Sequence, residues 1–203
     1  SLFDQNGERS AAIFYTAYVA KNADARRPLT FVFNGGPGAA STYLHLGLAG
    51  PRILDFGPDG RDGAAAKLVD NPDTWLAFTD LVFIDPVSTG LSRAAKGEKP
   101  EQFFGVDEDI QAVGEFVRLF TTREQRWASP KYFCGESYGV MRVAGLAQYL
   151  QEKHGLYAEG LARLERALTL HGARDGVRLA ALNGAGFAAF RLAHADRSDE
   201  ILV

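Results

Sequence analysis

The pentapeptide GESYG at 135–139 constrains this chain more than any other stretch of its sequence. Gly-x-Ser-x-Gly is the pattern of a nucleophile elbow, in which a serine stands on a tight turn between a strand and a helix. Side chains two residues to either side of the serine would collide there, so both positions need glycine. The apolar run at 131–134 and the helical pattern at 140–150 flank it in the required order. We therefore predict that Ser137 is a nucleophile; the alternative is a glycine-rich turn with a solvated serine.

Apolar runs alternate with amphipathic segments over most of the chain. Apolar side chains recur at helical spacing over 106–120 and again over 140–150, which predicts two helices. Short runs rich in apolar, aromatic and β-branched residues predict strands at 10–20, 28–33, 79–85 and 131–134. We expect the strand at 10–20 to lie near an edge of the sheet. This alternation favours an α/β fold with a mostly parallel sheet.

The pattern changes after residue 157. Leucines form a helical stripe over 161–168, and small residues form a second over 177–188. We expect a helical hairpin over 158–203, which weakly resembles a tetratricopeptide-type repeat. It would cover the unfinished sheet or offer a surface to a protein partner. The expected organisation is thus an α/β domain over 1–157 followed by this hairpin.

Composition excludes several classes of function. The 203-residue chain carries a net charge of −3 without a strong run of either sign, so neither nucleic acid nor an anionic membrane is an expected partner. Its one cysteine, Cys134, cannot form an internal disulfide, and we expect it to be a small buried residue. The four histidines lack zinc-site spacing, and we expect no metal or cofactor. No signal-peptide pattern is present, which leaves the location open.

Two further loops follow predicted strands. NGGPG at 34–38 can turn a backbone N–H, for instance that of Gly36, toward a reacting carbonyl. It is not a phosphate loop, because no Gly-Lys-Ser/Thr follows, and the alternative is a simple tight connection. DPVSTGLS at 85–92 is a polar turn at the end of another strand. Ligands of open α/β sheets bind at such strand ends.

Taken in order, these segments resemble the serine carboxypeptidase family, and its bacterial branch most closely. The resemblance covers roughly residues 8–157, and it is carried by FNGGPGAAS with the later AGPR, DLVFIDPVSTGLSR, and KYFCGESYGVMRVAGLAQYLQEKHG. It implies a partial α/β-hydrolase fold and hydrolysis of peptides at the C-terminus through an acyl-enzyme. It also suggests a secreted or periplasmic location.

The resemblance implies a role for each motif residue. Ser137 matches the nucleophile, and the substrate is expected to be a peptide with a free C-terminal carboxylate. The backbone N–H groups of Gly36 and Tyr138 match the oxyanion hole. The residues that match the binders of the terminal carboxylate are Asn34, Gly35 and Glu136. A carboxylate that binds another carboxylate must share a proton, so Glu136 should be partly protonated when substrate binds.

Four departures from the family pattern are visible in the sequence. Leu48 stands where many relatives carry a glutamate that shares this proton, and Ser88 stands where glycine is frequent. In the family, the Asp and His of the triad lie well over a hundred residues past the serine, whereas only residues 138–203 follow Ser137 here. A family-like chain should also continue after 154–157 into another strand, where we expect the hairpin.

The sequence assigns no base. His45, His154, His171 and His194 have no spacing that argues for contact with Ser137, so a surface position is expected for the last two. Three functions stay open: a serine-type carboxypeptidase, a non-catalytic truncated or fused fragment with an interaction tail, and an esterase. The carboxylate-binding residues favour the first over the third, and the missing Asp and His favour the second. We expect low or no carboxypeptidase activity from the isolated chain.

Overall fold

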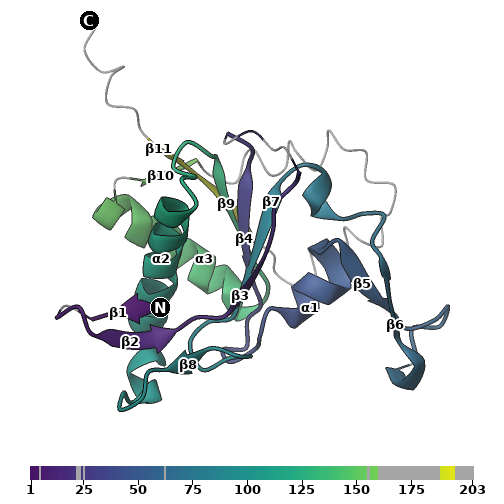
Figure 1. Cartoon of the computed structure of the whole chain (residues 1–203), viewed down its shortest axis with the longest axis horizontal. Helices are drawn as coiled ribbons and strands as arrows, with labels where there is room; N and C mark the ends of the chain where they lie inside the picture. The colour runs from purple at the N-terminus through teal and green to yellow at the C-terminus, as the bar shows by residue number, and fades with distance from the viewer. Residues whose placement is uncertain are drawn as a thin grey trace, which may run out of the picture.

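A central sheet with helices on both faces organises the computed structural model of the protein, which describes residues 1–4, 6–21, 24, 26–61, 63–154, 156–159 and 188–194 (Figure 1). The helices are α1 (Thr42–Leu44), α2 (Val106–Arg123) and α3 (Tyr138–His154). The strands are β1 (Leu2–Phe3), β2 (Arg9–Ala12), β3 (Tyr15–Tyr18), β4 (Leu29–Phe33), β5 (Arg52–Asp55), β6 (Lys67–Asp70), β7 (Asp80–Ile84), β8 (Arg93–Ala94), β9 (Lys131–Gly135), β10 (Leu156–Glu159) and β11 (Ala188–His194).

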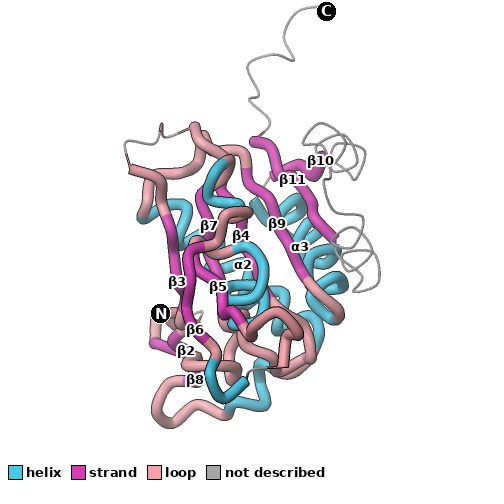
Figure 2. Tube along the Cα trace, turned by 90° about the vertical axis from the view of Figure 1, so that its right-hand side faces the viewer, coloured by secondary structure: helices cyan, strands magenta, loops and turns pink. Residues whose placement is uncertain are grey.

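The six-stranded sheet has the order β10-β11-β9-β4-β7-β3 (Figure 2). Strand β4 runs parallel to both β7 and β9, with Phe33 opposite Gly135 and Val32 opposite Phe83. The carboxyl ends of these three strands therefore meet at one edge of the sheet. The loop at 34–38, the turn at 85–92 and the elbow all follow them, so the three predicted motifs converge.

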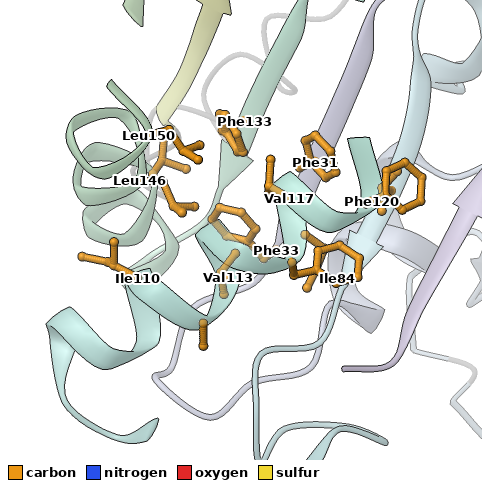
Figure 3. Close-up of a cluster of buried hydrophobic side chains, with 14 of the residues drawn as sticks. Phe31, Phe33, Ile84, Ile110, Val113, Val117, Phe120, Phe133, Leu146 and Leu150 are labelled. Carbon is orange, nitrogen blue, oxygen red and sulfur yellow. The ribbon is translucent and has the colours of Figure 1, made fainter. Parts of the chain in front are cut away.

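Side chains of the parallel strands alternate between two hydrophobic clusters, as the pleat of a strand requires. Phe31, Phe33 and Phe133 face the layer formed by α2 and α3, where Val113 and Leu146 also lie (Figure 3). All five are buried to 0% exposure, and full burial of such side chains stabilises the fold by about 1.5–3 kcal/mol each. The cluster on the opposite face comprises Val32, Leu44, Ala49, Leu81, Phe83 and Cys134.

The elements predicted around the elbow agree with the structure, but the strand predicted over 10–20 is divided. It forms β2, which pairs with β1 and β8 in a small sheet, and β3, the antiparallel edge of the large sheet. The chain passes between the two sheets at Ile13 and Phe14, where the backbone N–H of Phe14 donates to Oγ of Ser92 at 2.8 Å. The expected edge position holds for β3.

The helical hairpin predicted over 158–203 is wrong where the structure describes that segment. Ala188–His194, which includes the end of the second predicted stripe, is strand β11 and pairs antiparallel with the elbow strand β9. Strand β10 directly follows the elbow helix and pairs with β11, so the chain does continue into another strand. Backbone pairing along the free edge of β9 outweighs the helix propensity of alanine and leucine. Residues 160–187 and 195–203 lie outside the described residues.

A buried cluster of charges lies at the opposite, amino end of the parallel strands. Asp80, with 0% exposure, accepts hydrogen bonds from Nε of Arg27 at 3.0 Å and from Nη1 of Arg126 at 2.7 Å. Lys131 is also buried, and its ammonium group donates to the carbonyls of Trp127 and Ser129. Burial lowers the pKa of Lys131 to about 8, and Arg126 adds to this effect. Asp80 thus supplies the negative charge that pairs with Arg27 and Arg126 where the parallel strands begin.

Candidate active site

The elbow has the geometry that its sequence predicts. Ser137 is exposed and lies between β9 and α3. Its backbone φ is +57°, a left-handed value that residues other than glycine rarely adopt. A Cβ atom at Gly135 would lie 2.2 Å from the carbonyl oxygen of Gly139. A Cβ atom at Gly139 would lie 3.0 Å from the carbonyl oxygen of Phe33. Backbone atoms therefore exclude a side chain at Gly135 and leave little room for one at Gly139.

The glycine loop packs directly against this elbow. A Cβ atom at Gly35 would come within 2.5 Å of the Glu136 carbonyl oxygen and 2.6 Å of the Tyr138 nitrogen. Gly36, the next residue, is exposed and has φ of +107°, which favours glycine. The two backbone groups predicted to form an oxyanion hole, on Gly36 and Tyr138, thus belong to segments in close contact.

Two of the predicted carboxylate binders contact each other. Nδ2 of Asn34 donates to Oε2 of Glu136 at 3.3 Å, and its Oδ1 accepts from the backbone N–H of Leu44 at 3.1 Å. Asn34 is only 4% exposed, so these bonds hold its amide in place. Leu48 packs against the second hydrophobic cluster, so no acid stands at that position to pair with Glu136.

A buried ion pair behind the elbow was not predicted as part of the site. Nε of Arg142 donates to Oδ2 of Asp109 at 2.8 Å, and Nη1 donates to the carbonyl of Asn34 at 2.9 Å. The guanidinium carbon lies 5.1 Å from the centre of the Tyr138 ring. Burial raises the pKa of Asp109, and Arg142 opposes this shift. The sequence carries one sign of this ion pair, because Asp109 lies one helical turn before Val113, on the otherwise apolar stripe of α2.

A pocket of about 290 Å³ opens beside the elbow. Its wall includes the glycine loop, the turn after β7, the segment before α2 and the Arg142–Asp109 pair. The lining residues are Pro37, Gly38, Pro86, Val87, Ser88, Thr89, Phe103, Phe104, Asp109, Tyr138 and Arg142. Apolar walls with a few polar groups are typical of a ligand site.

The described histidines take positions that do not favour contact with Ser137. Nε2 of His45 lies 2.7 Å from the Tyr18 hydroxyl, and its ring stacks on Phe83. His154 ends α3, about 24 Å along the helix from its start. In β11, Ala188 is opposite Gly135, which places the backbone of His194 about 20 Å along the strand from the elbow. His171 lies outside the described residues. Within the described part of the chain, no hydrogen bond reaches Oγ of Ser137.

We expect the stability of the fold to decrease in mild acid because of His45. Burial lowers the pKa of His45, and Asp85 opposes the shift only in part. The unfolded chain therefore binds this proton at higher pH than the folded chain, so the free energy of unfolding falls as pH drops below about 6.5. Urea unfolding between about pH 7.5 and pH 5.5 measures this slope. In His45→Gln the slope should be shallower; an equal slope would assign it to other groups.

Ser88 carries a conformation that suits glycine. It is exposed, lines the pocket and has φ of +68°. We expect Ser88→Gly to raise the free energy of unfolding by up to about 1 kcal/mol, because relief of the left-handed conformation exceeds the added chain entropy. Ser88→Ala loses the same hydroxyl but keeps a Cβ atom, so it should give no gain. Thermal unfolding of the two variants separates conformation from hydrogen bonding.

Cys134 has the buried position that its sequence context predicts. Cys134 is 2% exposed, and burial raises the pKa of its thiol to about 12, which suits a packed residue and not a nucleophile. Among the described residues, no cluster of His, Cys, Asp or Glu could hold a metal ion. None of the helices in the described ranges is long and apolar enough to cross a membrane.

Comparison with known proteins identifies the family. A model of the family described as "Serine carboxypeptidase" matches residues 2–161. The chain is 28% identical to a "Carboxypeptidase Y homolog" of Arthroderma benhamiae, over 71% of this chain and 27% of that protein. It is 31% identical to "Serine carboxypeptidase-like 50" of Arabidopsis thaliana, over 70% of this chain and 32% of that protein.

A solved structure shows the same fold. The prohormone-processing carboxypeptidase Kex1 of Saccharomyces cerevisiae superimposes with a TM-score of 0.56 at 23% identity, over 75% of this chain and 32% of that one. This likeness confirms a partial α/β-hydrolase sheet. The chain spans less than a third of the length of each of these three proteins. With most of its length matched by the family model, the chain belongs to the serine carboxypeptidase family.

Proposed function

We propose that Ser137 is the nucleophile of a serine-type carboxypeptidase. The observation that carries this proposal is the contact between the glycine loop and the elbow, where a Cβ atom on Gly35 would lie 2.6 Å from the Tyr138 nitrogen. In this proposal the N–H groups of Gly36 and Tyr138 bind the oxyanion of the tetrahedral intermediate. The substrate's terminal carboxylate is bound by Asn34, Gly35 and Glu136.

The proposed reaction starts when Oγ of Ser137 adds to the last peptide carbonyl of the substrate. The oxygen of that carbonyl gains negative charge and is stabilised by the two N–H donors. The C–N bond then breaks, the C-terminal amino acid leaves, and an acyl-enzyme remains, which water hydrolyses. A base must take the proton of the serine and return it to the leaving amine. We assign that role to no described residue.

A non-catalytic fragment is the second candidate. The observation that favours it is that Oγ of Ser137 accepts or donates no hydrogen bond within the described ranges.

Several finer statements stay predictions: the division of the chain at 157, a protein partner for 158–203, and a secreted or periplasmic location. The relatives named above are fungal and plant proteins, so they do not support placement in the bacterial branch.

Labelling with a fluorophosphonate probe, located by mass spectrometry, tests the proposal. If a base reaches Ser137, the probe should attach there in the 203-residue chain and should not attach in Ser137→Ala. His171 and His194 would then be replaced to find the base. A folded chain that resists labelling would support the second candidate. In either case we expect slow or absent turnover of a blocked dipeptide, since a triad acts as a unit.

A further inference from the structure

Arg142 joins the elbow helix to the glycine loop. It lies on α3 one helical turn after Tyr138, and its Nη1 donates to the backbone carbonyl of Asn34, the first residue of the loop, at 2.9 Å. Two longer hydrogen bonds join the same segments: Nδ2 of Asn34 reaches Oε2 of Glu136 at 3.3 Å, and the N–H of Glu136 reaches the Phe33 carbonyl at 3.4 Å. The bond from Arg142 is shorter than these two and its donor is charged, so it is the strongest of the three.

The guanidinium group of Arg142 is held in one orientation. The side chain is only 2% exposed, and its Nε donates to Oδ2 of Asp109 on α2 at 2.8 Å. Its central carbon lies 5.1 Å from the centre of the Tyr138 ring and 5.3 Å from that of the Phe33 ring. A buried planar group with a carboxylate partner and two aromatic neighbours has little rotational freedom. Helix α2, the end of β4 and the elbow helix thus meet at this one side chain.

The middle of the glycine loop is exposed and depends on its ends for its position. Residues 36–39 are exposed, and Gly36, with φ of +107°, has no side chain that could anchor it. At the far end of the loop, the N–H of Ser41 donates to Oδ1 of the buried Asp85 at 2.9 Å. The near end is Asn34, two residues before the proposed oxyanion donor. The bond from Arg142 therefore acts on the end that lies closer to the Gly36 N–H group.

We propose that Arg142 is a positioning residue, which holds the glycine loop against the elbow and so sets the distance between the N–H groups of Gly36 and Tyr138. The proposal rests on the proposed carboxypeptidase function. Arg142 acts through the loop backbone, because its Nη1 bonds to the carbonyl of Asn34. Donors that are fixed in advance need no reorganisation when the oxyanion forms, and loss of one such donor slows a serine hydrolase by about 10²–10³-fold.

Geometry, and not charge, is what Arg142 contributes here. Asp109 accepts from it at 2.8 Å, so the two charges largely cancel at longer range. A lysine at this position would keep the positive charge, but its single ammonium group cannot reproduce the planar fork that meets the carboxylate, the Asn34 carbonyl and both rings. Arg142→Lys therefore separates charge from geometry.

The test uses the full 203-residue chain with Arg142→Met and Asp109→Leu combined. Removal of the arginine alone would leave a buried carboxylate unpaired, whereas replacement of a buried ion pair by apolar side chains is often neutral for stability. A second double variant combines Arg142→Met with Asp109→Asn, because residue 109 lines the pocket and an amide there can be hydrated. Thermal unfolding checks the fold of both. Arg118→Met, which removes the pair with Glu115 on α2, is the matched control.

Nuclear magnetic resonance relaxation of the backbone amides measures the positioning without any turnover. We expect an order parameter of about 0.8 for Gly36 in the parent chain and in Arg118→Met, and a value below about 0.6 in both double variants. Gly63, which follows β5 in the chain, is the internal reference and should not change. The proposal is overturned if Gly36 has the same order parameter in the parent and in a folded double variant, or if the parent value is already below about 0.6.

The rate of fluorophosphonate labelling at Ser137 tests the consequence for the chemistry. Where the parent chain is labelled, both double variants should lose about 100-fold in the maximal labelling rate. The probe concentration that gives half of this rate should stay within about twofold, because the bond from Arg142 acts on the oxyanion donors and not on binding of the probe. Arg142→Lys should be as slow as the double variants. A parent-like rate in Arg142→Lys would show that charge suffices and would overturn the assignment to the fork.

The two readouts keep this proposal apart from the proposed function. A parent chain that is not labelled counts against Ser137 as a working nucleophile, and the order parameter of Gly36 then still decides whether Arg142 holds the loop. A labelled parent with unchanged rates in folded double variants would overturn the role of Arg142 and leave the proposed function standing.

Discussion

Replacing Asp80 with asparagine is expected to lower the free energy of unfolding by about 3–5 kcal/mol. Asp80 is fully buried and accepts from both Arg27 and Arg126. Loss of its charge leaves the two guanidinium groups beside Lys131, whose pKa burial and Arg126 already lower to about 8. An uncompensated buried cation costs far more than a neutral pair contributes. Urea unfolding followed by circular dichroism measures the change.

The chain offers a matched control for this prediction. Asp70 forms the same kind of pair with Arg52, at 3.4 Å, but its side chain is 97% exposed. Asp70→Asn should therefore change the free energy of unfolding by less than about 0.5 kcal/mol. If Asp80→Asn and Asp70→Asn had similar effects, the cluster at the start of the parallel strands would not stabilise the sheet in the way described.

Gly135→Ala is expected to destabilise the fold by at least about 3 kcal/mol and to abolish any labelling of Ser137. The added Cβ atom would lie 2.2 Å from the Gly139 carbonyl oxygen and 2.4 Å from its carbon. These are backbone atoms of the elbow itself, so no side chain can rotate away to relieve the overlap. The turn must open, and the serine moves with it.

A graded series of alanine variants tests that steric account. At Gly139 the nearest atom to a new Cβ is the Phe33 carbonyl oxygen at 3.0 Å, so Gly139→Ala should cost less than Gly135→Ala. At Gly63 nothing lies within 4 Å, and Gly63→Ala should leave stability unchanged within about 0.5 kcal/mol. The thermal unfolding midpoints should follow this order. An equal loss at 63 and 135 would show that overlap with the Gly139 backbone does not set the cost at Gly135.

The site motifs could be read from sequence because each is local. The runs at 28–33, 79–85 and 131–134 are short and apolar, and a glycine or proline lies within two residues of the end of each. They form β4, β7 and β9 with small changes in their ends. The elbow needs only its own five residues and its flanking elements. Parallel pairing then brings the loops at 34–38 and 85–92 to it, because the carboxyl ends of the strands share one edge.

What could not be read depends on contacts between distant segments. Arg142 and Asp109 lie on different helices, and their bond is visible only when α2 packs against α3. The segment at 188–194 has the composition of a helix but forms a strand, because the edge of β9 offers it backbone partners. Local propensity is a weak guide where such a partner exists.

The placement of β11 has a consequence during synthesis on the ribosome. β3, β4, β7 and β9 are complete once Gly135 has been added, but the strand that covers the outer edge of β9 begins only at Ala188. At roughly 5–20 residues per second, the nascent chain carries that open edge for about 3 to 10 s. Unpaired strand edges recruit other chains. We therefore expect aggregation of the nascent chain to be most frequent during this interval.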